Sequence, residues 1–392
     1  MSPILLYTAR ILLGLAIFGT FTAAISLALA LIGAVRFKTQ KVPQISYLPP
    51  VSLLKPVHNS EKGLRENLTS YFNLDYPSFE LIFCARSLTD PAILCAQEVA
   101  KDFPSVPVRF IASGEPLWAN PKTFSMSLLV EAATHDVILI SDSDVRVDRG
   151  YLQQVVQPLA DPKVGLVTCI FRGKSAGGFP STLIALNQTV EFSSGVLTAN
   201  LLEGMTFGLG PTLLTRKSNV EQIGGLAKMG NLLADDFWLG NKIFHTGYSV
   251  ALSNAIVDHM ISCKNLASGI RHQISWAKNT RRTRPAGHLG TGLTFATPFG
   301  LIGLFAALTL GHPVLGVSLL LAACVNRWTQ ALLIGYFTVK DPAALKFFWL
   351  YPVCDLLGFC SWLASYGGAT ISYRGERYRI ERDGTIIRIS AK

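Results

Sequence analysis

Two aspartates separated by one residue, Asp142 and Asp144, have the clearest chemical potential in this sequence. They follow Asp136–Ser141 (DVILIS), a short apolar run rich in β-branched residues that predicts a buried strand. Ligands of open α/β sheets bind at the carboxyl ends of the strands. Two carboxylates there could hold Mg²⁺ or Mn²⁺ carrying a diphosphate, because such an ion keeps several waters and needs few protein ligands. Turns also use aspartate freely, so the pair alone does not establish a metal site.

A second acidic pair, Asp235 and Asp236, lies in the stretch Leu233–Leu239 (LADDFWL), which predicts the start of an apolar helix. A carboxylate at this place could act as a base, although acidic residues in a first helical turn often only complement the helix dipole. A basic segment, Arg271–Arg284, follows and contains His272, Trp276, Lys278, Arg281 and Arg282. Its simplest interpretation is a basic helix facing solvent or a membrane.

Alternating strand and helix patterns in the middle of the chain must position these residues. Strands are predicted at Val51–Leu54, Phe79–Ala85, Val108–Ile111 and Val164–Phe171, and helices over Leu64–Phe72, Pro91–Asp102 and Thr123–Thr134. This order predicts an α/β domain with a mostly parallel sheet and its ligands at one edge.

The two ends of the chain are strongly apolar. Of 392 residues, 49% are hydrophobic and only 15% charged, which is too apolar for an ordinary soluble protein. Ile11–Val35 is long enough to cross a bilayer, and its length and lack of a cleavage site favour an anchor over a signal peptide. Three later apolar stretches are Leu293–Leu310, Val314–Phe337 and Phe347–Ala364.

The net charge of +10 lies largely beside these apolar segments. Anionic lipid headgroups fit that distribution better than nucleic acid, because the sequence has no basic domain interleaved with aromatic residues. The seven cysteines contain no CxxC pair, so neither a disulfide framework nor a zinc site is expected.

Basic residues after Val35 place the middle domain in the cytosol. The arginines of the C-terminal tail favour the same side, yet three complete C-terminal spans would place the tail outside. Either the tail is translocated or one segment lies in the interface, and Leu293–Leu310 is our candidate because Pro298 and several glycines interrupt it. Asn326 and Arg327 are costly in lipid, so we expect them to face protein or a headgroup.

We therefore predict a multi-pass membrane protein with four parts. They are an N-terminal transmembrane anchor with a basic linker (1–46), a cytosolic α/β domain (47–288), C-terminal transmembrane or interfacial helices (289–368) and a basic tail (369–392).

Taken together, these motifs and apolar segments make the sequence resemble the membrane-bound glycosyltransferases of the family 2/21 type, above all ceramide glucosyltransferases and the related hopanoid-associated enzymes. The resemblance covers almost the whole chain and rests on ordered blocks: VSLLKPVHN from Val51, LTDPA at Leu88–Ala92, NPK at Asn120–Lys122, ISDSDVRV at Ile140–Val147, LADDFWLG at Leu233–Gly240 and HQISWAKNTRRTRPAGH from His272. It implies a GT-A type nucleotide-sugar-binding domain.

The resemblance also implies roles for single residues. Asp90 is the first family aspartate, which contacts the base and ribose; Asp142 with Asp144 is the second, which binds the diphosphate through a divalent cation. Lys122 lies near the nucleotide, and Asp236, beside Asp235, is the catalytic base.

The closing family motif, (Q/R)xxRW, is incomplete here. Trp276 is its tryptophan, but His272 stands where Gln or Arg is usual and Ser275 replaces the Arg that supports the donor diphosphate. We expect nearby Lys278, Arg281 or Arg282 to take over that contact.

The favoured interpretation is an inverting glycosyltransferase that moves glucose from UDP-glucose to ceramide. Inversion is expected because one base without a second carboxylate nucleophile implies direct displacement. The alternatives are a hopanoid acceptor, a processive polysaccharide synthase, disfavoured by the small transmembrane region, and a non-catalytic scaffold that binds nucleotide sugar, suggested by the missing Arg.

Overall fold

The computed structural model describes residues 2–40, 47–373 and 376–389. Its contacts form two compact units, each assembled from segments distant in sequence. We call Met1–Thr39, Gly177–Leu202 and Cys263–Gly368 the helical unit, and Gln40–Ala176, Glu203–Ser262 and Ala369–Lys392 the sheet unit. The chain thus leaves and re-enters the sheet unit, and its C-terminal segment belongs to the same unit as the two acidic pairs.

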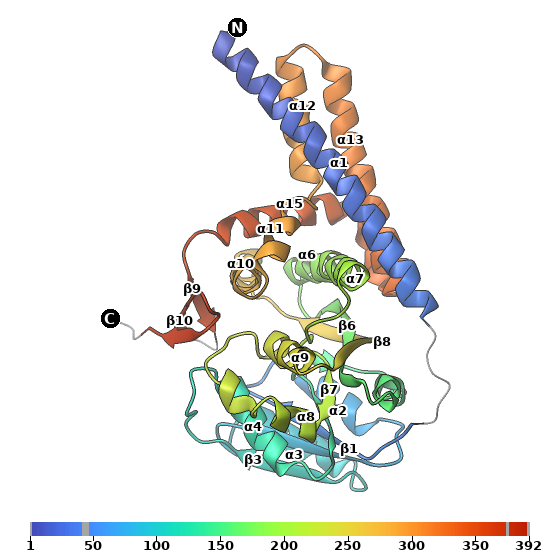
Figure 1. Ribbon diagram of the computed structural model, residues 1–392, viewed down its shortest axis with the longest axis vertical. Helices are drawn as coiled ribbons and strands as arrows, with labels where there is room; N and C mark the ends of the chain where they lie inside the picture. Colours follow the sequence, from blue (N-terminus) through green and yellow to red (C-terminus); the bar gives the residue numbers. More distant parts are fainter. Residues whose placement is uncertain (1, 41–46, 374–375, 390–392) are drawn as a thin grey trace. The chain divides into compact units, whose positions relative to one another are not determined.

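An eight-stranded sheet forms the core of the sheet unit (Figure 1), with the order β3-β2-β1-β4-β7-β6-β8-β5. The strands are β1 Val51–Pro56, β2 Phe79–Ala85, β3 Val108–Ala112, β4 Val137–Ile140, β5 Val145–Arg146, β6 Val164–Ser175, β7 Leu213–Arg216 and β8 Ser249–Ile261. β1, β2, β3 and β4 are parallel, as are β6 and β8, while β7 is antiparallel to both of its neighbours. The predicted mostly parallel α/β sheet is confirmed.

The central strands are buried along their whole length, because helices or loops cover both faces of such a sheet. All six residues of β1 and all four of β4 are buried. The helices of this unit are α2 Leu64–Phe72, α3 Pro91–Lys101, α4 Pro121–Ala132, α5 Tyr151–Val155, α8 Lys217–Gln222 and α9 Asp235–His245, with 3₁₀ turns at Gln157–Ala160 and Leu226–Met229.

The C-terminal segment forms a separate antiparallel sheet, which we call the C-terminal sheet. Its strands are β9 Thr370–Tyr373, β10 Glu376–Ile380 and β11 Ile386–Arg388, in the order β11-β10-β9. Ile371, Tyr378, Ile380 and Ile386 form its buried cluster, against which Ala119 and Leu233 pack. The alternation of buried and exposed residues along β10 is that of a strand with one covered face.

In the helical unit, α1 (Pro3–Thr39) packs against α12 (Thr297–Thr309), α13 (Pro313–Gln330) and α7 (Ser193–Leu202). Small residues allow this close approach: a Cβ on Gly33 would lie 2.6 Å from the Leu197 carbonyl oxygen, and one on Gly316 would lie 2.9 Å from that of Leu304. Among the described residues, three helical segments are long and apolar enough to cross a membrane: Pro3–Thr39, Pro313–Thr338 and Pro342–Ala364.

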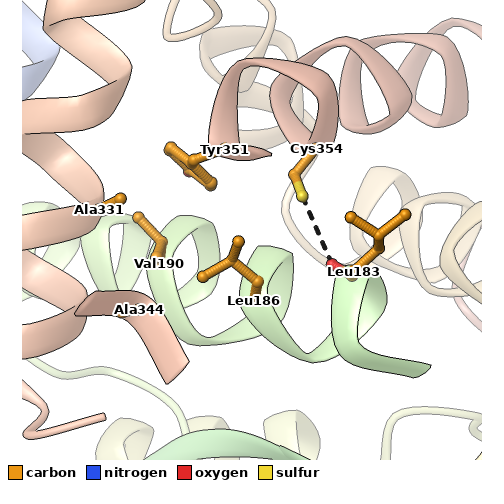
Figure 2. Packing of buried hydrophobic residues seen from close by; sticks show 7 residues of the cluster. All are labelled: Leu183, Leu186, Val190, Ala331, Ala344, Tyr351 and Cys354. Atoms are coloured by element: carbon orange, nitrogen blue, oxygen red, sulfur yellow. Dashed lines mark hydrogen bonds between the residues drawn. The ribbon is translucent and has the colours of Figure 1, made fainter. Parts of the chain in front are cut away.

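The remaining helices of this unit are α6 Phe179–Asn187, α10 Leu266–Thr283, α11 Pro285–Thr291, α14 Pro342–Phe347 and α15 Tyr351–Ala364; a 3₁₀ turn covers Phe348–Leu350, and π-helical turns cover Gln188–Phe192 and Ala331–Thr338. Figure 2 shows the apolar cluster that joins them: Leu186 and Val190 point toward Tyr351 and Cys354 of α15, with Ala331 and Ala344 alongside. α15 runs across the direction of α1 and α13 (Figure 1).

The polar residues of the C-terminal apolar segments face protein. The guanidinium of Arg327 is buried and lies 3.1 Å from Asp355 and 3.9 Å from Glu191. Asn326 donates to the Ala23 carbonyl oxygen of α1. Asp355 in turn accepts from the amides of Ala296 and Thr297 at the start of α12. Removing one partner of such a buried pair costs about 3–5 kcal/mol, so this network holds the helices together.

Candidate active site

Lys122 joins the two acidic pairs. Its ammonium nitrogen lies 2.7 Å from Asp142 Oδ1 and 2.9 Å from Asp235 Oδ2. β4 delivers Asp142 to the carboxyl edge of the sheet, and α9 begins at Asp235. Burial alone lowers the pKa of Lys122, but the two carboxylates outweigh it and raise the pKa well above its ordinary value. The three motifs predicted to act together therefore converge on one cation.

Helix caps place Lys122. Asn120 is the N-cap of α4, and its Oδ1 accepts from the amides of Lys122 and Thr123. Its Nδ2 donates to the Leu232 carbonyl oxygen at 2.8 Å and to that of Leu233 at 3.3 Å, in the loop that leads into α9. One side chain thus fixes α4 against the acidic pair of α9.

A buried lysine that the sequence analysis did not single out supports the loop of Asp142. Lys55, on β1, donates to the Asp142 carbonyl oxygen at 2.6 Å, and its ammonium lies 3.6 Å above the centre of the Tyr71 ring. Burial lowers the pKa of Lys55 to about 7, against the opposing charges of Asp142 and Asp144. Lys55 therefore supplies positive charge and a fixed hydrogen bond directly beneath the acidic loop.

Asp144 is paired with His259 of β8, whose Nε2 lies 3.0 Å from Asp144 Oδ2. Burial raises the pKa of Asp144, but the His259 charge and hydrogen bond outweigh it, so the net pKa is lowered. Asp144 Oδ1 is buried without a hydrogen-bond partner among the described residues. An orphaned carboxylate oxygen of this kind costs free energy unless a ligand satisfies it.

These oxygens fit a divalent cation that is completed by a diphosphate. Within residues 2–40, 47–373 and 376–389, no three His, Cys, Asp or Glu side chains are arranged to hold a metal by themselves. Mg²⁺ and Mn²⁺ do not require such a set, because waters and substrate phosphates supply their other ligands. Asp142 and Asp144 are the residues that would hold the ion.

Asp236 has the environment of a base. Its Oδ2 accepts from the amide of Gly210 and its Oδ1 from that of Phe237. Burial, together with repulsion from Asp235, raises the pKa of Asp236 to about 6. Asp235 is more deeply buried and is held by Lys122. The raised pKa of Asp236 suits proton acceptance near neutral pH.

Gly210 keeps space between the motifs. A Cβ at this position would lie 3.0 Å from Asp142 Oδ2 and 3.3 Å from Asp236 Oδ2. Both carboxylates therefore lie against the backbone of Gly210, and a side chain at this position would come into steric conflict with them. Gly210 thus allows Asp142 and Asp236 to approach the same point of the backbone.

Asp90 lies at the N-terminus of α3 rather than beside the other aspartates. Its Oδ1 caps the helix through the amide of Ala92 and also accepts from the amide of Asn59, while its Oδ2 lies 3.7 Å from His58 Nδ1. The carboxylate thus shapes the loop after β1. That loop lines a cavity of about 150 Å³ at the carboxyl ends of β1, β2 and β3.

The residues of the closing motif lie on α10 in the helical unit. The rings of His272 and Trp276 are 5.2 Å apart, and Ser275 bonds to the Arg271 carbonyl oxygen within the helix. Arg281 donates to the Gly368 carbonyl oxygen, whereas Arg282 Nε is buried without a hydrogen-bond partner in the described part of the chain. Burial lowers the pKa of Lys278. The expectation that one of these basic residues contacts the donor diphosphate stays a prediction.

The residues that the sequence analysis missed carried only weak signals. Lys55 ends the apolar run VSLLK, and a lysine at the end of a buried strand is unusual enough to have drawn attention. His259 lies in a strand of ordinary alternation, and Gly210 in a glycine-rich turn. A single sequence does not indicate that His259 and Gly210 lie beside the acidic pairs in the fold.

Comparisons with known proteins identify the family of this chain. The family described as glycosyl transferase family 21 matches residues 15–386. Ceramide glucosyltransferase 1 of Caenorhabditis elegans is 32% identical over 215 residues, which are 54% of this chain and 46% of the relative. Ceramide glucosyltransferase 3 of the same organism is 28% identical over 268 residues, 68% of this chain and 58% of the relative. The chain thus spans about half the length of the curated relatives it matches.

Among solved structures, a mannosyltransferase from Pyrobaculum calidifontis in complex with GDP-Man and Mn²⁺ is similar, with a TM-score of 0.55 and 17% identity. The match covers 91% of this chain and 99% of that one. This likeness bears on the fold, and it agrees with the mixed, mostly parallel sheet described above.

Proposed function

Because this chain belongs to glycosyl transferase family 21, we propose that it transfers a hexose from a UDP-sugar, foremost UDP-glucose, to the hydroxyl of a membrane lipid, foremost ceramide. The observation that carries the proposal is the convergence of Asp142, Asp235 and Asp236 around Lys122 and Gly210. Glycosyl transfer needs stabilisation of the leaving diphosphate and a general base, and these residues are our candidates for both tasks.

Asp236 is the proposed base. With a pKa of about 6 it is largely ionised at neutral pH, yet it is basic enough to accept a proton from an acceptor hydroxyl as that oxygen attacks the anomeric carbon. The amides of Gly210 and Phe237 orient its two oxygens. Asp235, its neighbour, is held by Lys122 and is therefore not offered as a nucleophile, which supports direct displacement with inversion.

Lys122 and Lys55 are the proposed cationic partners of the donor diphosphate, the first by direct contact and the second by fixing the loop of Asp142. A divalent cation held by Asp142 and Asp144 would add Lewis-acid stabilisation of the departing diphosphate. The similar mannosyltransferase, solved with GDP-Man and Mn²⁺, supports this assignment.

The acceptor is proposed to be a membrane lipid. Three candidate spans lie in the same chain as the acidic pairs, and the curated relatives are ceramide glucosyltransferases. The basic residues Arg36 and Lys38, at the end of α1, favour a cytosolic sheet unit.

Lipid analysis of an expressing host tests this proposal. The host should contain both ceramide and hopanoids and lack its own lipid glucosyltransferase. We expect hexosylceramide to appear with the wild-type chain and not with Asp236→Asn. Appearance of a hexosylated hopanoid instead would show that a hopanoid, and not ceramide, is the acceptor. Identical lipids in the strains that express the wild-type chain and Asp236→Asn would refute lipid glycosylation.

A further inference from the structure

The cavity at the carboxyl ends of β1, β2 and β3 is closed by residues from opposite ends of the sheet unit. One part of its wall comes from the loops after these strands and includes His58, Arg86 and Trp118. The other part comes from the C-terminal sheet and consists of Glu376, Tyr378 and Arg388. A cavity that needs residues about 300 positions apart is completed only when the C-terminal sheet docks.

The C-terminal sheet is held against the active-site loops through backbone contacts. The amide of Ile386 donates to the Asn231 carbonyl oxygen at 2.8 Å, and Leu232 and Thr385 form a β-bridge. Its apolar cluster also packs against Ala119 and Leu233. These contacts lie immediately before Asn120 of α4 and before the acidic pair of α9, so the sheet is built onto the same loops that place Lys122 and Asp235.

The cavity and the proposed diphosphate site are both bordered by the start of α4. Pro121 lines the cavity, and the next residue, Lys122, contacts Asp142. A donor whose diphosphate lies at Asp142 would therefore direct its nucleoside end toward this cavity. Two ion pairs on the wall, Arg86 with Glu115 and Arg388 with Glu376, offer donors and acceptors, and Trp118 offers an aromatic face. This combination suits a polar, planar nucleobase.

We propose that the C-terminal sheet is a part of the donor site, with Glu376, Tyr378 and Arg388 forming one wall of a pocket for the base of a nucleoside diphosphate. The proposal rests on the function proposed above. Along β10 the cavity-lining residues alternate with Arg377 and Arg379, which are exposed. Arg388 lines the cavity and Arg377 does not, although both lie in the C-terminal sheet and carry the same charge. They therefore provide a matched pair of substitutions for a test.

Photolabelling of the full chain in detergent tests where the base binds. The probe is 5-azido-UDP-glucose, whose reactive group is on the uracil ring, and labelled peptides are mapped by mass spectrometry with and without excess UDP. We expect UDP to suppress a label between residues 376 and 388. A label that UDP suppresses elsewhere, with none in this segment, would overturn the proposal.

Calorimetric titration of UDP provides the second measurement and needs no acceptor. We expect Arg388→Ala to weaken UDP binding about tenfold and Arg377→Ala, which removes the same charge, to change it less than twofold. Equal affinities in the two variants would contradict the wall assignment. A wild-type chain that binds no UDP would refute both this inference and the donor proposed above, whereas a chain that binds UDP normally but transfers no sugar would refute only the transferase function.

Discussion

A single ammonium group, that of Lys122, links the residues on which the proposed chemistry depends. It forms ion pairs with both Asp142 and Asp235, whereas the oxygens of the neighbouring Asp236 accept from backbone amides. Burial and the charge of Asp235 raise the pKa of Asp236. We therefore propose different roles for the two adjacent aspartates: Asp235 positions Lys122, and Asp236 accepts the proton.

Asp142→Asn should abolish measurable transfer, because the amide no longer provides the charge that the cation and Lys122 require. EDTA should inactivate the native protein, and added Mg²⁺ or Mn²⁺ should restore it. Sugar transfer from UDP-glucose is measured in both cases. Asp148→Asn, an exposed carboxylate nearby, serves as the control and should behave as wild type. Full activity in EDTA with no metal in the preparation would exclude the metal.

Asp236→Asn should lower turnover by about 10² to 10⁴, the usual contribution of a positioned base, while UDP binding is largely kept. In the native protein turnover should fall as pH decreases through about 6, because protonated Asp236 cannot accept the hydroxyl proton. The variant should lack this acidic limb. The pH profile of kcat gives both results; a normal Asp236→Asn beside an inactive Asp235→Asn would show that the roles are reversed.

The acidic residues of this site could be predicted from the sequence, but the residues that contact and hold them could not. Asp142, Asp144 and the acidic pair of α9 are adjacent in sequence to recognisable elements. Lys55 and His259 reach them only because β1 neighbours β4, and β8 pairs with β5, in the folded sheet. A single sequence contains no record of that pairing.

At the scale of elements, the start of α4 connects the two parts of the site. Asn120 both caps this helix and binds the carbonyl groups before α9. Asn120→Ala should destabilise the protein by about 1 kcal/mol through the lost cap, and more through the lost links. Asn120→Asp keeps the cap but not the two donors.

The two variants separate the two roles of Asn120. We expect Asn120→Asp to retain most of the thermal stability but to lower sugar transfer, because the loop before Asp235 is released from α4. Thermal unfolding and turnover are measured on the same samples. Wild-type turnover in Asn120→Asp would show that the cap alone matters.

The elements themselves follow the sequence patterns closely where periodicity is strong. The strands predicted at Val51–Leu54 and Phe79–Ala85 are β1 and β2, because continuous apolar runs are typical of buried parallel strands. The C-terminal sheet was missed, since the arginines that alternate with Tyr378 and Ile380 give the appearance of a solvated basic tail. Only the docking surface at Ala119 and Leu233 explains why this segment folds.

At the scale of the whole molecule, the organisation of the sheet unit constrains the membrane topology. The chain leaves this unit after Ser262 and re-enters it at Ala369. We propose that both points lie on the same side of the membrane, in which case the intervening segment crosses an even number of times. This proposal disfavours three complete C-terminal spans.

The helical unit indicates which segment lies in the interface. The sequence pointed to Leu293–Leu310, yet α12 packs along α1, where a Cβ on Gly303 would lie 3.2 Å from Ala16 Cβ. α15 instead runs across α1 and α13 (Figure 1). We propose that α13 and α12, which is shorter than the three candidate spans, form a hairpin through the membrane, and that α15 lies at its surface although its segment is long enough to cross.

Epitope accessibility in intact cells tests this topology. A tag inserted at the turn Gly311–His312, between α12 and α13, should bind antibody without permeabilisation, because this turn lies outside. A C-terminal tag should bind only after permeabilisation, like the sheet unit. An exposed C-terminal tag would contradict the even number of crossings.

The central claim, that the acidic pairs and Lys122 catalyse sugar transfer to a lipid, is tested most directly by turnover of the purified full chain. UDP-glucose and ceramide are supplied in detergent micelles, and the lipid product and its anomeric configuration are identified by mass spectrometry and NMR. The account predicts β-linked glucosylceramide from the α-linked donor, with the product lost in Asp236→Asn although UDP still binds. Retained configuration, or UDP binding without transfer to any lipid, would contradict it.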